Sequence, residues 1–92
     1  MSKVCAELII QGRVQGVFYR QSTKETALRL GLNGWVKNRA DGSVAALFEG
    51  DKAIVEQAIA WCRQGPAAAN VSDVNVNWLD YEGAYSSFEV RY

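Results

Sequence analysis

Two sets of side chains alternate along residues 4–11, and both contain apolar members. One set is Val4, Ala6, Leu8 and Ile10, and the other is Cys5, Glu7, Ile9 and Gln11. Apolar residues on both faces are typical of a strand that is covered on both sides. The pattern therefore predicts that this segment is a central strand of a sheet.

Residues 19–30 place apolar and small side chains at helical spacing. The face they form is Tyr19, Thr23, Thr26, Ala27 and Leu30. Gly31 follows directly, and glycine is common just beyond the C-terminus of a helix. The spacing predicts a helix over 19–30 that ends at Gly31 and is reached from the first strand through a glycine-containing loop.

Residues 34–38 and 43–49 are predicted to be two strands of a hairpin. The turn between them, residues 39–42, contains Asp41-Gly42, a strong hairpin signal. Asp51 then stands at the expected N-cap of a second helix, which Gly65-Pro66 must stop. The apolar face expected on this helix is Ile54, Ala58, Trp61 and Cys62.

Two more strands are predicted after a connector at residues 67–69. Apolar residues alternate with others in each, namely Val74, Val76 and Trp78 in the first and Phe88, Val90 and Tyr92 in the second. The element order is therefore β-α-β-β-α-β followed by a last strand. With right-handed crossovers this order gives the α+β ferredoxin-like sandwich, a mostly antiparallel sheet with both helices packed on one face. Residues 1–92 are expected to form a single domain.

The composition agrees with one small folded domain. Of 92 residues, 49% are hydrophobic and 22% are charged, as in a globular protein. No apolar run approaches the ~18 residues of a membrane span, and Met1-Ser2-Lys3 does not open a signal peptide, so a cytoplasmic protein is expected. Cys5 and Cys62 are too few for a disulfide framework or a zinc cluster, and they are expected to be free thiols.

The chain contains no histidine, which removes the commonest general base and metal ligand together with every Ser/His or Cys/His nucleophile. Any catalysis must then depend on positioning and electrostatics. The net charge is zero, but residues 1–39 carry seven Lys and Arg against two Asp and Glu, and residues 40–92 carry three against eight. This separation indicates either an anion site in the first half or charged faces that pair with each other.

The loop from Gly12 to Arg20 is the main candidate for chemistry. It leads into a helix N-terminus, where backbone N–H groups lack partners and the helix dipole is positive. Arg20 stands in the first turn, where a cation is unfavourable unless an anion is bound, and Gly16 would let the backbone approach phosphate oxygens. The spacing is neither the Walker type nor the dinucleotide type. In the alternative reading, the glycines only make the turn and Arg20 points to solvent.

Asn38 is the second candidate, at the end of the strand Gly34-Trp35-Val36-Lys37-Asn38. Its side chain could cap the following turn, or its amide could hold a water molecule through donor and acceptor together.

The two segments together closely resemble both signatures of the acylphosphatase family. The first is Gly12-Arg13-Val14-Gln15-Gly16-Val17 closing on Arg20, and the second is Gly34-Trp35-Val36-Lys37-Asn38 followed by Gly42-Ser43-Val44 and Gly50. The likeness covers nearly the whole chain. One departure is Tyr19, where the family usually has Phe or Met.

The resemblance implies hydrolysis of small acyl phosphates to a carboxylate and inorganic phosphate, without metal or cofactor. It implies that Arg20 binds the phosphoryl group, that Asn38 orients the attacking water, and that a phosphate-binding loop supplies backbone amides. The residues of this loop are Gln15, Gly16, Val17, Phe18, Tyr19 and Arg20. Phosphoryl transfer of this kind needs positioning and charge stabilisation rather than a histidine.

A second interpretation is a non-catalytic module of the same fold that senses an anion, because fold alone does not decide function. RNA binding is not expected, since the net charge is zero and the aromatic signature of an RNA-recognition sheet is missing. The expected partners are therefore a small acyl phosphate and inorganic phosphate, with no nucleic acid and no membrane, and the protein is expected to be a monomer.

Overall fold

Seven elements follow one another along residues 2–92, the part of the chain that the computed structural model describes. They are β1 (Lys3–Arg13), α1 (Tyr19–Leu30), β2 (Asn33–Asn38), β3 (Val44–Asp51), α2 (Lys52–Gln64), β4 (Asn70–Leu79) and β5 (Phe88–Arg91). The strands form one sheet in the order β4-β1-β3-β2-β5. All neighbouring pairs are antiparallel except β2 and β5, which are parallel.

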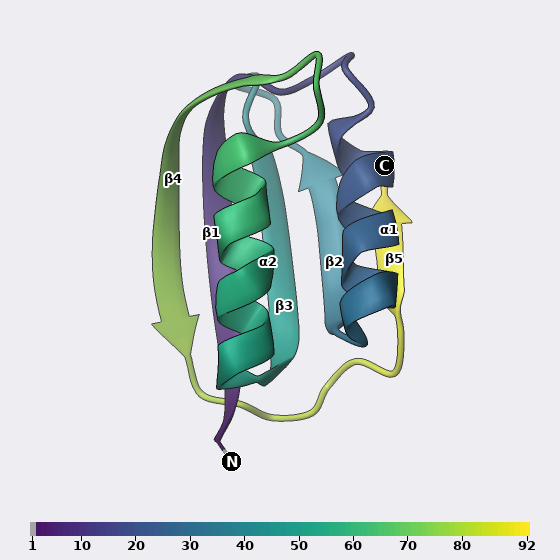
Figure 1. Cartoon of the computed structure of the whole chain (residues 1–92), viewed down its shortest axis with the longest axis vertical. Coiled ribbons are helices and arrows are strands. Elements are labelled where there is room, and N and C mark those ends of the chain that lie inside the picture. Colours follow the sequence, from purple (N-terminus) through teal and green to yellow (C-terminus); the bar gives the residue numbers. More distant parts are fainter. Residues whose placement is uncertain (1) are drawn as a thin grey trace.

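Both helices pack on the same face of this sheet, as Figure 1 shows. The main core lies between the two layers, and β1 contributes Ala6, Leu8 and Ile10 to it as fully buried residues. β1 is paired along both edges, with β3 and with β4. The predicted α+β ferredoxin-like architecture and the predicted central strand are therefore confirmed.

Local signals placed the helix ends correctly. Gly31 adopts the left-handed conformation with φ 73°, and its N–H bonds to carbonyls of the last turn of α1, as a glycine C-cap does. Asp51 caps α2, its Oδ1 accepting from the N–H of Ala53 at 3.3 Å. Strand β4 is longer than predicted and begins at Asn70.

The buried face of α2 differs from the prediction. Ala58 and Cys62 are buried as expected, but Val55 and Ile59 complete the stripe, while Ile54 and Trp61 are only partly buried. The two stripes share Ala58 and Cys62, so helical spacing alone could not choose between them. Trp61 lies at the edge of the core, where its ring packs against Tyr19 with 5.6 Å between the ring centroids.

A smaller apolar cluster covers part of the opposite face of the sheet. It contains Cys5, Trp35, Ala45 and Leu47. Tyr85 packs against this cluster, and its hydroxyl accepts from the indole N–H of Trp35 at 3.2 Å. Cys5 belongs to this cluster and Cys62 to the main core, so the two thiols lie on different faces of the sheet, and both are free.

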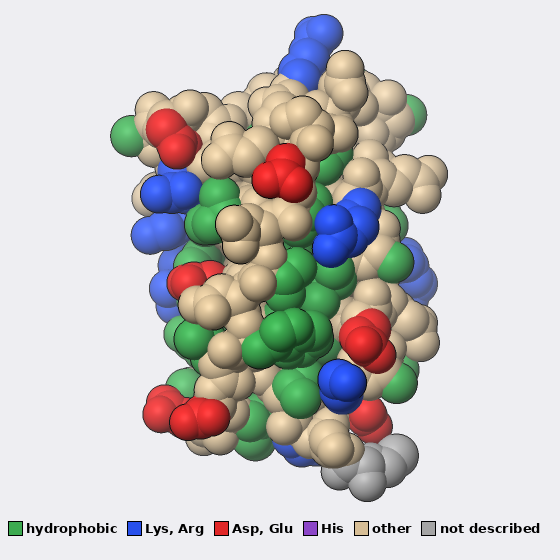
Figure 2. All heavy atoms as spheres, turned by 90° about the vertical axis from the view of Figure 1, so that its left-hand side faces the viewer, with side chains coloured by type: hydrophobic (Ala, Val, Ile, Leu, Met, Phe, Trp, Pro, Cys, Tyr) green, Lys and Arg blue, Asp and Glu red, His purple; other side chains and the backbone are tan. Residues whose placement is uncertain are grey.

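Figure 2 looks onto the side of the molecule formed by β4 and α2, where apolar side chains reach the surface. A shallow hollow between β4 and α2 is lined by Val76 and Trp78, of which Trp78 is 46% exposed, and by the buried Ile59 at its base. Neither helix of residues 2–92 is long and apolar enough to cross a membrane.

Tyr19 joins the two helices through a buried hydrogen bond. Its hydroxyl donates to the carbonyl oxygen of Cys62 at 2.7 Å. Within a helix that carbonyl would accept from the N–H four residues on, but this residue is Pro66, which has none. Burial raises the pKa of the Tyr19 phenol, so the hydroxyl keeps the proton that it donates. Tyrosine at position 19, in place of Phe or Met, thus supplies a donor to the Cys62 carbonyl at the end of α2.

We expect Tyr19→Phe to lower the free energy of unfolding by about 1–3 kcal/mol, because it leaves the buried Cys62 carbonyl without its donor. Chemical denaturation measures the change. Tyr81→Phe is the matched control, since the Tyr81 hydroxyl makes no hydrogen bond within residues 2–92. Equal stability losses in the two variants would contradict the role given to the Tyr19 hydroxyl.

Candidate active site

The loop between β1 and α1 has an unusual backbone. Phe18 is the only residue other than glycine in the described chain with a positive φ, at 62°, and Gly16 has φ 74°. A left-handed residue with a side chain costs on the order of 1–3 kcal/mol and tends to occur at functional sites. Left-handed residues that alternate with ordinary ones turn successive N–H groups toward one point, which makes a concave anion site.

The N-terminus of α1 adds further free donors. The first intrahelical bond runs from the N–H of Ser22 to the carbonyl of Phe18 at 3.0 Å. The N–H groups of Tyr19, Arg20 and Gln21 precede it and therefore have no acceptor within the helix. Among residues 2–92 no side chain caps this end, and the first turn of α1 contains no acidic residue. The dipole of α1 thus ends in an uncompensated positive charge.

Arg20 adds a full positive charge at the same place. Its Nη1 donates to the carbonyl of Arg91 at 3.1 Å, and its guanidinium lies over the ring of Tyr92, 4.7 Å from the centroid. Within residues 2–92 no carboxylate forms an ion pair with it. The side chain is oriented by a carbonyl and an aromatic ring, and its charge remains available to an anion.

Arg20 and Asn38 line one cavity of about 240 Å³. Gly16, Phe18 and Tyr19, which the family resemblance assigns to a phosphate-binding loop, also line it. Gln15 and Val17 do not, because Val17 is buried in the core and the Gln15 side chain turns toward the β2–β3 hairpin. The remaining lining residues are Val14, Gln21, Val90 and Tyr92.

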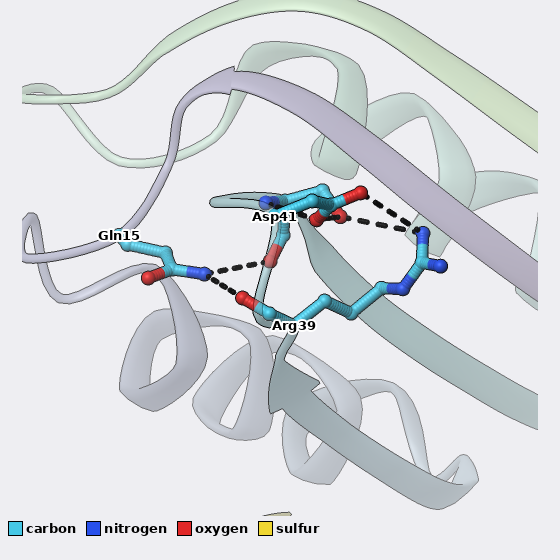
Figure 3. A network of polar contacts seen from close by, with 4 residues as sticks. Gln15, Arg39 and Asp41 are labelled. Carbon is cyan, nitrogen blue, oxygen red and sulfur yellow. Dashed lines mark hydrogen bonds and ion pairs between the residues drawn. The ribbon is translucent and has the colours of Figure 1, made fainter.

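Figure 3 shows the contact that Gln15 makes with the hairpin turn. Its Nε2 donates to two carbonyl oxygens, that of Arg39 at 2.8 Å and that of Ser43 at 2.9 Å. The same two residues are joined by a backbone bond from the N–H of Arg39 to the Ser43 carbonyl at 2.8 Å. The Gln15 side chain therefore connects the loop to the turn that follows Asn38.

Asp41 caps this turn. Its Oδ1 accepts from the N–H of Ser43 at 3.0 Å and from the Ser43 hydroxyl at 2.6 Å. These hydrogen bonds hold the pKa of the Asp41 carboxyl below its usual value, and Arg39 forms an ion pair with it at 3.6 Å.

The Asn38 side chain makes no hydrogen bond to residues 2–92, so its donor and acceptor are free to bind a water molecule in the cavity.

Sequence reasoning did not find Val90 and Tyr92 as site residues. They reach the cavity because β5 pairs in parallel with β2, with Arg91 opposite Lys37 near the end that carries Asn38. The alternation of Phe88, Val90 and Tyr92 places these side chains on one face of a strand. Only the pairing of β5 with β2 shows which end of the sheet that face meets.

Metal-ligating residues do not gather in the described part of the chain. Within residues 2–92 there is no group of three His, Cys, Asp or Glu side chains that could hold a metal ion.

Comparison with known proteins gives a consistent result. The family model described as Acylphosphatase matches residues 6–90. A protein named acylphosphatase from Pelotomaculum thermopropionicum is 48% identical over 92 residues, covering 100% of both chains. Among solved structures, an acylphosphatase from Coxiella burnetii has a TM-score of 0.92 at 38% identity, covering 97% of this chain and 93% of its own.

A second solved structure, the acylphosphatase from Bacillus subtilis, has a TM-score of 0.93 at 31% identity and covers 97% of this chain and 99% of its own. The similarity thus spans the strands, both helices, the loop before α1 and the turn after Asn38. On this evidence the chain belongs to the acylphosphatase family.

Proposed function

We propose that this protein hydrolyses the carboxyl-phosphate bond of small acyl phosphates, giving a carboxylate and inorganic phosphate. The observation that carries the proposal is a single cavity at the N-terminus of α1 that is lined by both Arg20 and Asn38. Arg20 forms no ion pair with a carboxylate of residues 2–92. Turnover of acetyl phosphate without added metal tests it directly. An anion-sensing module of the same fold would bind phosphate in this cavity but would leave acetyl phosphate intact.

The phosphoryl group binds where the positive charge collects. Backbone amides of the loop residues that line the cavity, Gly16 and Phe18 to Arg20, bind its oxygens, and the guanidinium of Arg20 forms a fork that meets two of them. Arg91 and Tyr92 hold the guanidinium in place through the carbonyl and the aromatic ring. The bound anion compensates both the helix dipole and the Arg20 charge.

Asn38 orients the attacking water from the end of β2. The water oxygen forms a bond to phosphorus while the bond from phosphorus to the acyl oxygen breaks, and the electron pair leaves with the carboxylate. The proton of the water passes to a phosphoryl oxygen, so an acyl phosphate dianion and water become a carboxylate and dihydrogen phosphate. A carboxylate is a good leaving group, so positioning and charge stabilisation suffice.

The acyl end meets few specific contacts. Around the cavity, Phe18 is 82% exposed, and Val90 and Tyr92 add further apolar surface. Apolar surface distinguishes poorly between small groups that differ by a methylene. We therefore expect the enzyme to tolerate a range of small acyl groups.

The basic half of the chain supports an anionic substrate. Several basic residues lie at the end of the sheet that carries the cavity. Arg13 ends β1, Arg20 stands in the first turn of α1, and Arg39 begins the turn after β2. Lys37 of β2 lies opposite Arg91 of β5. Arg39 and Arg91 form ion pairs with Asp41 and Glu89. The remaining positive field would attract phosphate esters and anhydrides.

We further propose that the protein works as a monomer in the cytoplasm, consistent with its two free, buried thiols.

We expect Arg20→Lys to lower kcat/KM by at least about 100-fold, the scale of losing a positioned donor, and to weaken inhibition by inorganic phosphate. Lysine keeps one charge but loses the planar fork. Arg29→Lys, an exposed change on the same helix, is the control and should keep parent activity. Steady-state kinetics with acetyl phosphate measures both variants. Near-parent turnover and phosphate affinity in Arg20→Lys would remove the role given to this residue.

We expect Asn38→Ala to lower kcat by on the order of 100- to 1000-fold while KM changes little, because the side chain acts on the water in the transition state and scarcely on the bound substrate. Asn77→Ala, on the exposed surface of β4, is the control. Circular dichroism shows whether the variant is folded. A folded Asn38→Ala enzyme whose whole defect lies in KM would return Asn38 to a structural role in the turn.

We expect a strong chelator to leave the rate unchanged, because the chain has no histidine and residues 2–92 offer no cluster of metal ligands. Inorganic phosphate should inhibit competitively, since it occupies the site of the phosphoryl group. Initial rates with and without chelator, and at several phosphate concentrations, measure both effects. Activity that disappears in chelator and returns with a divalent cation would establish a metal-assisted mechanism instead.

A further inference from the structure

We infer that the side chain of Gln15 is a positioning residue of the active site, which holds Asn38 in register with the phosphate-binding loop. Its Nε2 donates to the carbonyl oxygens of Arg39 and Ser43 at 2.8 and 2.9 Å. The inference rests on the proposed function, because it concerns the geometry between the group that binds phosphate and the group that orients water.

The sheet alone does not fix this geometry. The loop follows β1 and Asn38 ends β2, and β3 lies between these two strands. The β1–β3 ladder stops at Ile10 and Val44. Beyond that point no backbone hydrogen bond joins residues 14–18 to the turn at 39–43 in the described chain. The two halves of the site are therefore connected across the end of β3 by side-chain contact.

Gln15 makes this connection one rung beyond Asn38. Asn38 pairs with Val44 in the β2–β3 ladder, and the next pair outward is Arg39 with Ser43, joined by a backbone bond of 2.8 Å. Gln15 bonds to both carbonyls of that outer pair (Figure 3). A shift of the outer pair relative to the loop would carry Asn38 with it.

The turn is stiff enough to transmit this restraint. The carboxylate of Asp41 accepts from both the N–H and the hydroxyl of Ser43, at 3.0 and 2.6 Å. The N–H of Gly42 donates to the Arg39 carbonyl at 3.2 Å. The residues on both sides of the Gln15 contact are thus bonded to each other. The turn moves as a unit, and Gln15 sets where that unit lies against the loop.

The chemistry of the contact requires an amide. Both partners are carbonyl oxygens, which only accept, so the nitrogen of Gln15 and both of its hydrogens must face the turn. Glutamate has the same length but would direct carboxylate oxygens at two carbonyls. Methionine has nearly the same shape and no donor. These two substitutions separate the hydrogen bonds from the volume of the side chain.

The test compares Gln15→Met with Gln57→Met, a control at an exposed position of α2. With acetyl phosphate, Gln15→Met should lower kcat by about 10- to 100-fold, the cost of a water misplaced by about 1 Å. The inhibition constant of inorganic phosphate should change by less than about 3-fold, because the backbone amides and Arg20 remain. Gln57→Met should match the parent protein.

A double variant tests whether Gln15 acts through Asn38. Residues that act as one unit give non-additive losses. Adding Gln15→Met to Asn38→Ala should therefore cost little further kcat. Losses that multiply, or a parallel loss of phosphate affinity, would overturn the inference and leave Gln15 as a residue that only shapes the loop.

Gln15→Glu gives a second signature. At neutral pH the kcat of Gln15→Glu should fall below that of Gln15→Met. As the pH falls, the kcat of Gln15→Glu should rise relative to that of Gln15→Met, because a protonated carboxyl can donate one hydrogen bond. A ratio that does not change with pH would contradict the contact.

A readout independent of turnover keeps this inference separate from the proposed function. NMR relaxation of backbone amides should show residues 39–43 more mobile in Gln15→Met, with residues 16–20 unchanged. If the parent protein does not hydrolyse acetyl phosphate, the proposed function fails, while this mobility difference still supports the connection made by Gln15. An equally ordered turn in both proteins overturns it.

Discussion

Positive charge without an acidic partner at the N-terminus of α1 is the constraint around which this site is built. The helix dipole ends there with no capping side chain, Arg20 adds a full charge with no carboxylate beside it in the described chain, and Phe18 is held in a left-handed conformation. Each feature costs free energy in a protein without a ligand. A bound anion would offset the electrostatic cost, and left-handed residues such as Phe18 are of the kind that turn successive backbone amides toward one point.

The rest of the fold supplies the rigidity that holds this charge in place. The loop is anchored on one side by β1, which is paired along both edges, and on the other by α1, which packs over the sheet. The C-terminal strand brings a carbonyl and an aromatic ring to the Arg20 guanidinium. Strong interactions inside the scaffold thus permit unfavourable ones at its end, as is common where a protein stores strain at a functional site.

Two contacts show how single side chains complete what the backbone cannot. The hydroxyl of Tyr19 donates a hydrogen bond to the Cys62 carbonyl, which Pro66 cannot do because it has no N–H. This bond joins the end of α2 to the start of α1. The amide of Gln15 joins the loop to the hairpin turn across the end of β3. Both contacts use a donor aimed at a backbone carbonyl. They link the elements on which Arg20 and Asn38 stand.

The sequence by itself determined the elements and the family signatures, because these depend on neighbours along the chain. Periodicity placed α1 at residues 19–30, and the preferences of Gly31, Asp51 and Asp41-Gly42 for special backbone conformations placed caps and turn. Only the tertiary structure decided that Val55 and Ile59 face the core, since two stripes on α2 fit the same spacing. It also decided that Tyr92 meets Arg20 and that Gln15 reaches the turn. Those contacts join residues far apart in the chain, and they follow from strand order and register, which local sequence preferences do not specify.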